Sequence, residues 1–115
     1  MVRLPVSLLL AALVVPALAK DPDCSGIERW PTRSALVVLT NAGVADKIDF
    51  AKTRTTRVAS ERIGTDLYRQ VHHVTYTDVS GKTINALVVN DVSSEECSTS
   101  AVQVFVVSER LGSTE

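Results

Sequence analysis

The stretch LYRQVHHVTYTDVSGKTINALVVN, residues 67–90, carries the strongest structural signal in the chain. Its two halves, 67–77 and 83–90, are rich in β-branched and aromatic residues, and they flank the short segment DVSGK at 78–82. Gly81 can adopt the left-handed conformation that a hairpin loop of this kind requires. The stretch therefore predicts an antiparallel β-hairpin on which the rest of the domain is built.

A polar, threonine-rich segment precedes the hairpin, from Lys52 to Ser60. Basic residues alternate there with threonines, which suits an exposed edge strand better than a central one. A competing helical pattern overlaps this region, with apolar residues at every fourth position: Ala59, Ile63, Leu67 and Val71. Gly64 would cost such a helix about 1 kcal/mol, so the strand is favoured.

The segment from Ala35 to Thr40 is apolar and β-branched, and Asn41, Ala42 and Gly43 end it. This combination predicts a strand followed by a turn. A short helix closed by Gly43 is the alternative.

The final apolar run, Ala101 to Val107, carries apolar side chains at both odd and even positions. A strand that is apolar on both faces is typical of the middle of a sheet, so we expect a central strand here. The tail from Gly112 to Glu115 is expected to fray.

Two serine–glutamate pairs, at 25–28 and 93–96, have the spacing of a helix capping box. The first predicts a single helical turn that carries Trp30 and that Pro31 stops. Trp30, the one tryptophan, is expected to pack in the core beside the cysteines.

The N-terminus has the pattern of a signal peptide. Arg3 is followed by an apolar run that is short against the about 20 residues needed to cross a bilayer, and Pro16 disfavours an uncleaved membrane helix. The run ends in Ala-Leu-Ala at 17–19, before the polar Lys20. We therefore predict a cleaved signal peptide at residues 1–19 and a single small exported domain at 20–115.

Two cysteines in an exported domain of this size predict a disulfide, Cys24–Cys97. It would close a loop of about 70 residues and stabilise the fold by roughly 4 kcal/mol. Intermolecular bridges are the alternative. The elements together predict an α+β fold that is mainly antiparallel β, with about five strands, one or two short helices and one disulfide.

His72 and His73 are the only histidines. Adjacent side chains in a strand point to opposite faces, so these two rings cannot bind one ion together, and a zinc site usually needs three or four ligands. We expect one histidine to be buried and the other exposed, with no metal and no cofactor.

The segment SGKT at 80–83 matches the end of a phosphate-binding loop, but Tyr76 stands where the first glycine belongs, and a strand follows instead of a helix. We interpret it as a hairpin turn. The GxSxG pattern of a serine hydrolase is missing from the chain, and we expect no catalytic residues.

Five basic residues form the candidate binding set: Lys52, Arg54, Arg57, Arg62 and Arg69. Such a set can bind phosphate, an acidic saccharide or an acidic protein surface; the alternative is a charged edge that prevents aggregation. The whole chain has 12 basic and 13 acidic residues, and loss of Arg3 with the signal peptide makes the formal charge −2. Nucleic acid is therefore not an expected partner.

Three stretches, CSGIERWP at 24–31, DLYRQVHHVTYTDVSGK at 66–82 and SSEECS at 93–98, resemble a group of small uncharacterised exported proteins of Gram-negative bacteria. The resemblance implies a periplasmic or secreted location with an intact cysteine pair and implies no activity.

These observations favour a non-enzymatic periplasmic or secreted binding protein, of the inhibitor or immunity type, that acts on a protein or envelope partner. A structural envelope component or surface antigen is the first alternative. A small hydrolase that uses His72 or His73 is the second.

Overall fold

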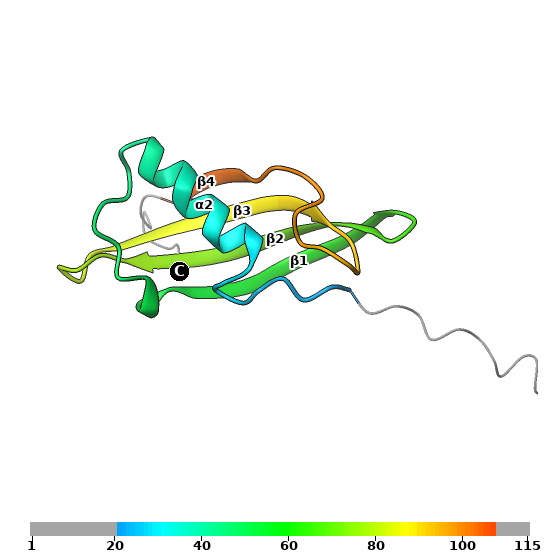
Figure 1. Cartoon of the computed structure of the whole chain (residues 1–115), viewed down its shortest axis with the longest axis horizontal. Coiled ribbons are helices and arrows are strands. Elements are labelled where there is room, and N and C mark those ends of the chain that lie inside the picture. The colour runs from blue at the N-terminus through cyan, green and yellow to red at the C-terminus, as the bar shows by residue number, and fades with distance from the viewer. Residues whose placement is uncertain (1–20, 108–115) are drawn as a thin grey trace, which may run out of the picture.

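A computed structural model describes residues 21–107 of the chain. Four strands form one antiparallel sheet in the order β1-β2-β3-β4, and helix α2 lies across one face of it (Figure 1). The elements are α2 (Trp30–Asn41), the short 3₁₀ helix η1 (Phe50–Lys52), β1 (Arg54–Gly64), β2 (Leu67–Thr77), β3 (Thr83–Val92) and β4 (Gln103–Val107). The predicted signal peptide at 1–19 and the tail at 112–115 lie outside the described residues.

The central hairpin is confirmed. Strands β2 and β3 pair without interruption from Tyr68–Val92 to Thr77–Thr83. In the loop between them, the Asp78 carboxylate accepts hydrogen bonds from the backbone N–H groups of Ser80 (2.8 Å) and Lys82 (2.9 Å), while Gly81 adopts a φ of +94°. The SGKT segment is therefore a hairpin turn, as predicted.

Strand β1 is confirmed as an edge strand, and the competing helix over this region does not form. The strand starts at Arg54 and extends to Gly64, beyond the predicted end at Ser60. Its ladder with β2 shifts register twice, once at Val58 and once at Ile63. Such irregularities bend and twist an edge strand.

The strand predicted at 35–40 is wrong, because this segment is the middle of helix α2. Pro31 lies in the first turn, where its missing N–H group is not needed, so it helps to start the helix instead of stopping one. Gly43 closes the helix with a φ of +77°, and the N–H of Val44 donates to the carbonyl of Leu39 at 2.9 Å. The alternative of a short helix closed by Gly43 is the correct one.

Two further expectations are corrected. Trp30 is 44% exposed on the outer side of α2 and does not pack in the core beside the disulfide. Strand β4 is not central but is the outer strand next to β3. Because 35–40 is helical, the sheet within residues 21–107 has four strands and not five. The coarser prediction, a mainly antiparallel β fold with some helix, is confirmed.

The covered face of the sheet has two parts. Under α2 lies an apolar cluster, named here the helix half: Ala35, Leu39, Ala45, Val74, Tyr76, Ala86 and Val88. The remainder, named the disulfide half, combines a small apolar cluster with three buried polar side chains: Cys24, Tyr68, Val92, Gln70, His72 and Asn90. The sheet residues of both parts are alternate residues of β2 and β3, as the two-residue period of strands requires, and α2, Ala45 and Cys24 cover them.

Candidate functional site

Three segments meet at one end of the sheet, at the right in Figure 1. They are the N-terminal segment 21–25, the β1–β2 turn at 64–66 and the β3–β4 loop at 93–102, and we call them together the disulfide end. Binding residues are often carried on loops that a rigid scaffold positions, which makes this end a candidate site.

The predicted disulfide is confirmed. Cys24 and Cys97 are joined with an S–S distance of 2.04 Å, across 73 positions of sequence. Cys24 is fully buried and packs with Tyr68 and Val92. The Asn90 side chain donates to the carbonyl of Cys97 at 2.8 Å. The β3–β4 loop is thus fastened both to the N-terminal segment and to β3.

The N-terminal segment is held to the sheet by its backbone. The carbonyl of Pro22 accepts hydrogen bonds from Gln70 (2.8 Å) and Arg57 (2.9 Å). One position later, the Asp23 carboxylate accepts from both the N–H and the hydroxyl of Ser25. These bonds lower the pKa of Asp23. The carboxylate is therefore charged at neutral pH and orders the entry to the disulfide.

The other two segments are tied to each other. Asp66 adopts a φ of +49° in the β1–β2 turn, and its carboxylate accepts from the N–H (3.0 Å) and the hydroxyl (2.7 Å) of Ser94. Within the β3–β4 loop, the Ser93 hydroxyl accepts from the N–H groups of Glu95 and Glu96. The 93–96 segment therefore forms a capped turn, without a helix after it.

A shallow groove runs between the N-terminal segment and the β3–β4 loop. It is lined by Pro22, Asp23, Arg29, Ser93, Ser94, Glu95, Glu96 and Cys97. Three of these side chains are acidic, and only Arg29 is basic. With Asp66 beside Ser94, the surface of the disulfide end is mainly acidic.

The two histidines lie on opposite faces, as predicted. His72 is fully buried on the covered face, and His73 is half-buried on the other face, with its Nε2 3.0 Å from Oδ1 of Asn85. The expectation of an exposed second ring is therefore only partly correct. Burial lowers the pKa of His72 below its usual value of 6.5, and the charge of Arg57 adds to this while Asp23 opposes it.

A row of buried polar side chains under the N-terminal segment is a feature that the sequence analysis missed. Gln70 pairs directly with Asn90 across β2 and β3, and His72 follows on the same face. Both ring nitrogens of His72, the Gln70 Oε1 and the Asn90 Oδ1 have no hydrogen-bond partner among residues 21–107. Polar residues in a strand usually indicate exposure, so only their place in the alternation, among Tyr68, Val74 and Tyr76, could have indicated burial.

The five predicted basic residues do not form one surface. Register places Arg54 and Arg69 on the uncovered face of the sheet, whereas Arg57 and Arg62 pair with residues of the covered face. Four of the five take part in side-chain contacts with carboxylates or backbone. Lys52 lies 3.9 Å from Asp49, Arg69 makes a two-bond pair with Asp91, and Arg62 donates to the carbonyl of Gly64. Arg57 holds Pro22, which leaves Arg54 as the member without such a contact among residues 21–107.

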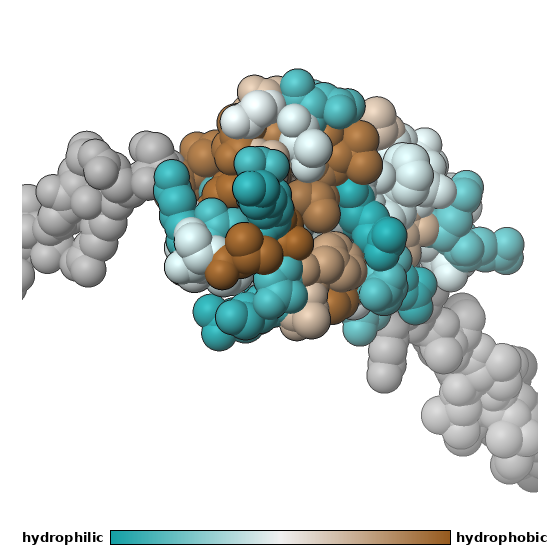
Figure 2. Space-filling model, turned by 60° about the vertical axis from the view of Figure 1, so that its left-hand side comes forward, coloured by the Kyte–Doolittle hydropathy of each residue, from teal (hydrophilic) through white to brown (hydrophobic). Residues whose placement is uncertain are grey.

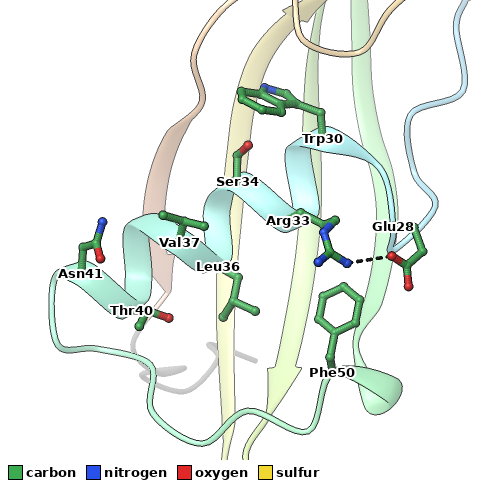
Figure 3. A pocket seen from close by; sticks show the side chains of 9 residues that line it. All are labelled: Glu28, Trp30, Arg33, Ser34, Leu36, Val37, Thr40, Asn41 and Phe50. Atoms are coloured by element: carbon green, nitrogen blue, oxygen red, sulfur yellow. Dashed lines mark hydrogen bonds and ion pairs between the residues drawn. The ribbon is translucent and has the colours of Figure 1, made fainter.

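A second groove follows the outer side of α2 (Figure 3). Its wall is formed by Trp30, Ser34 and Val37 on the helix and by Phe50 of η1. Arg33 lies between Glu28, at 2.7 Å, and the ring of Phe50, at 5.1 Å from its centroid. Figure 2 shows hydrophobic surface in the upper part of the molecule, where α2 lies, interrupted by hydrophilic side chains. This groove is more apolar than the disulfide end but is less firmly fixed by hydrogen bonds.

Neither a family model, a curated protein nor a solved structure matches this chain. Within residues 21–107, no helix is long and apolar enough to cross a membrane. No three histidine, cysteine, aspartate or glutamate side chains of the same residues converge to hold a metal ion.

Proposed function

We propose that the chain is an exported, non-enzymatic binding protein whose disulfide end contacts a protein partner, in the manner of an inhibitor or an immunity protein. The observation that carries the proposal is the fixing of three separate segments at that end by one disulfide and by side-chain hydrogen bonds to backbone. Loops already held in one conformation lose less entropy on binding, so more of the contact energy becomes affinity.

The location follows from the same feature. A disulfide that closes so long a segment of chain is stable in an oxidising compartment, which supports the periplasm or the outside of the cell. The acidic lining of the groove favours a partner that presents basic side chains there, since opposite charges steer association.

The test is a binding measurement with a matched pair of charge reversals. Glu95→Lys changes an exposed carboxylate in the β3–β4 loop, and Asp46→Lys changes an exposed carboxylate near the opposite end of the molecule. A partner captured from the cell envelope is identified, purified and titrated with each variant. We expect Glu95→Lys to weaken binding about tenfold or more, as for a charge inside an interface, and Asp46→Lys to leave it unchanged.

Equal effects of the two reversals would place the partner elsewhere and contradict the proposal. A chain that retains no partner at all would favour the structural envelope component. The partner should also be recovered chemically intact after incubation, whereas cleavage that depends on His72 or His73 would favour the hydrolase.

A further inference from the structure

The two edges of the sheet are built differently. The β1 edge carries two register shifts and four charged residues: Arg54, Arg57, Glu61 and Arg62. Bulges and charges of this kind prevent an edge from pairing with another strand. The β4 edge has neither: its sequence QVFVV is uncharged, and its ladder with β3 is regular. Within residues 21–107, no strand pairs with the outer side of β4.

The β4 edge is also apolar on both faces. Phe105 is 55% exposed on the uncovered face of the sheet, in register with Leu87, and Val106 is 46% exposed next to Ala86 of the covered face. Val107 completes the strand and is exposed to a similar degree. An ordinary solvent-facing edge strand would carry polar side chains on at least one side.

Helix α2 adds one more apolar side chain to this edge. The helix contacts β4, and Leu36 and Thr40 lie on the side of the helix that faces Phe50 (Figure 3). Residues two apart in a helix point about 200° apart, so Val38 lies on the flank opposite Leu36. Because Phe50 belongs to η1, which contacts β2, the flank opposite it is the one on the β4 side. Val38 is exposed as well. Val38, Phe105, Val106 and Val107 together form the edge patch.

We infer that β4 pairs in antiparallel fashion with β4 of a second copy of this chain, across a two-fold axis at Phe105. Each Phe105 then lies beside its counterpart, and Val104 lies beside Val106 of the other copy. Aromatic and β-branched cross-strand pairs stabilise a sheet, and the absence of charge in the strand leaves no like charges opposed. The same patch serves both copies, as a two-fold interface requires.

A second copy fits the edge patch better than an unrelated strand because the fit extends beyond the backbone. A two-fold axis perpendicular to the sheet gives an eight-stranded sheet with both α2 helices on one face. The Val38 flank of each helix then turns toward the other copy. The two disulfide ends lie at opposite ends of the dimer, because paired strands run in opposite directions, and both stay free.

The size of the contact sets the expected strength. Each copy contributes five strand residues and one helical side chain to the contact. A contact of this size buries less than about 1,200 Å², and such interfaces are usually weak or transient. Since even interfaces of standard size can be as weak as about micromolar, the dimer should dissociate reversibly at roughly micromolar or higher concentration. Its expected signature is a sedimentation coefficient that rises with concentration.

The first experiment is sedimentation velocity on the protein purified from an exporting host, with its disulfide intact. Phe105→Lys places two positive charges opposite each other in the pair. Val58→Lys is the matched control, since Val58 is also 55% exposed but lies on the β1 edge. We expect Phe105→Lys to weaken the dimer at least tenfold and Val58→Lys to leave it unchanged. A wild-type chain that stays monomeric up to high micromolar concentration, or equal effects of both variants, overturns the inference.

The second experiment tests the two-fold register and controls for misfolding. Phe105→Glu and Phe105→Lys are each expected to be monomeric with unchanged circular dichroism. Mixed together they should form a heterodimer, because position 105 of one chain meets position 105 of the other. If the wild type dimerises but the mixture does not, the register centred on Phe105 is wrong.

Discussion

The two halves of the covered sheet face are stabilised by different means. In the helix half, α2 buries Ala35 and Leu39 against Val74 and Val88, and burial of apolar surface supplies the free energy. The Tyr76 hydroxyl adds a 2.6 Å hydrogen bond to the carbonyl of Thr32. This half is an ordinary helix-on-sheet core.

The disulfide half has less apolar surface to bury. Its cover is an extended segment, and its floor includes the polar side chains of Gln70, His72 and Asn90. Buried polar atoms without partners cost free energy, so another contribution has to compensate for them. The disulfide is therefore the principal stabiliser where the helix does not reach. The end with the candidate binding loops is also the end that depends on a covalent bond.

The largest effect should come from removing that bond. The double change Cys24→Ala and Cys97→Ala is expected to lower the free energy of unfolding by roughly 4 kcal/mol, because the unfolded chain regains the freedom of a long closed loop. Urea unfolding measures the loss. Amide hydrogen exchange should then accelerate first in β3 near Asn90 and last under α2. Uniform acceleration along the chain would contradict the division into two halves.

The next effect belongs to the helix half. Leu39→Ala removes a buried side chain from the apolar cluster and should cost about 3 kcal/mol, the middle of the range for such truncations. Val37→Ala, two positions away and 58% exposed, is the control and should change stability by less than about 0.5 kcal/mol. Thermal or urea unfolding of both variants compares them. Similar losses would show that α2 does not present Leu39 to the sheet.

The sequence predicts the parts of the fold that local chemistry fixes. The hairpin follows from two β-rich runs around Asp78 and Gly81, and the pair Cys24–Cys97 follows from the cysteine count together with the predicted export of the chain. The exposed β1 edge follows from its polar, threonine-rich sequence, in which basic residues alternate with threonines. Each of these signals lies within a few residues or depends on a single pair.

The place of each element within the whole fold was harder to predict from the sequence. The segment 35–40 has the apolar, β-branched composition of a strand. A helix forms there because Pro31 and Gly43 set its ends and because Ala35 and Leu39 are buried against the sheet. Apolar residues on both faces of β4 predicted a central strand by the usual rule. In this chain they mark an outer strand, whose second neighbour we infer to be another copy.

The candidate site was also only partly predictable. The cysteines were found from the sequence, but the polar contacts of Asp66 with Ser94 and of Gln70 with Pro22 join residues 28 and 48 positions apart. Nothing local in the chain indicates such pairs. The basic residues of β1 are close in sequence, but the alternation of the strand places Arg54 on one face of the sheet and Arg57 and Arg62 on the other.

The smallest expected effect is a pH dependence of stability. It tests the buried polar floor of the disulfide half at His72. Its pKa in the folded protein is lowered mainly by burial, so the unfolded chain binds a proton more readily as the pH falls through the ordinary value of 6.5. Stability should therefore decline between about pH 7 and pH 5, above the range in which Asp23 and Asp78 begin to lose their charge. Unfolding midpoints of the wild type, His72→Gln and His73→Gln measure this. His72→Gln should flatten the decline, His73→Gln should retain it, and a decline that survives His72→Gln would assign it to another group.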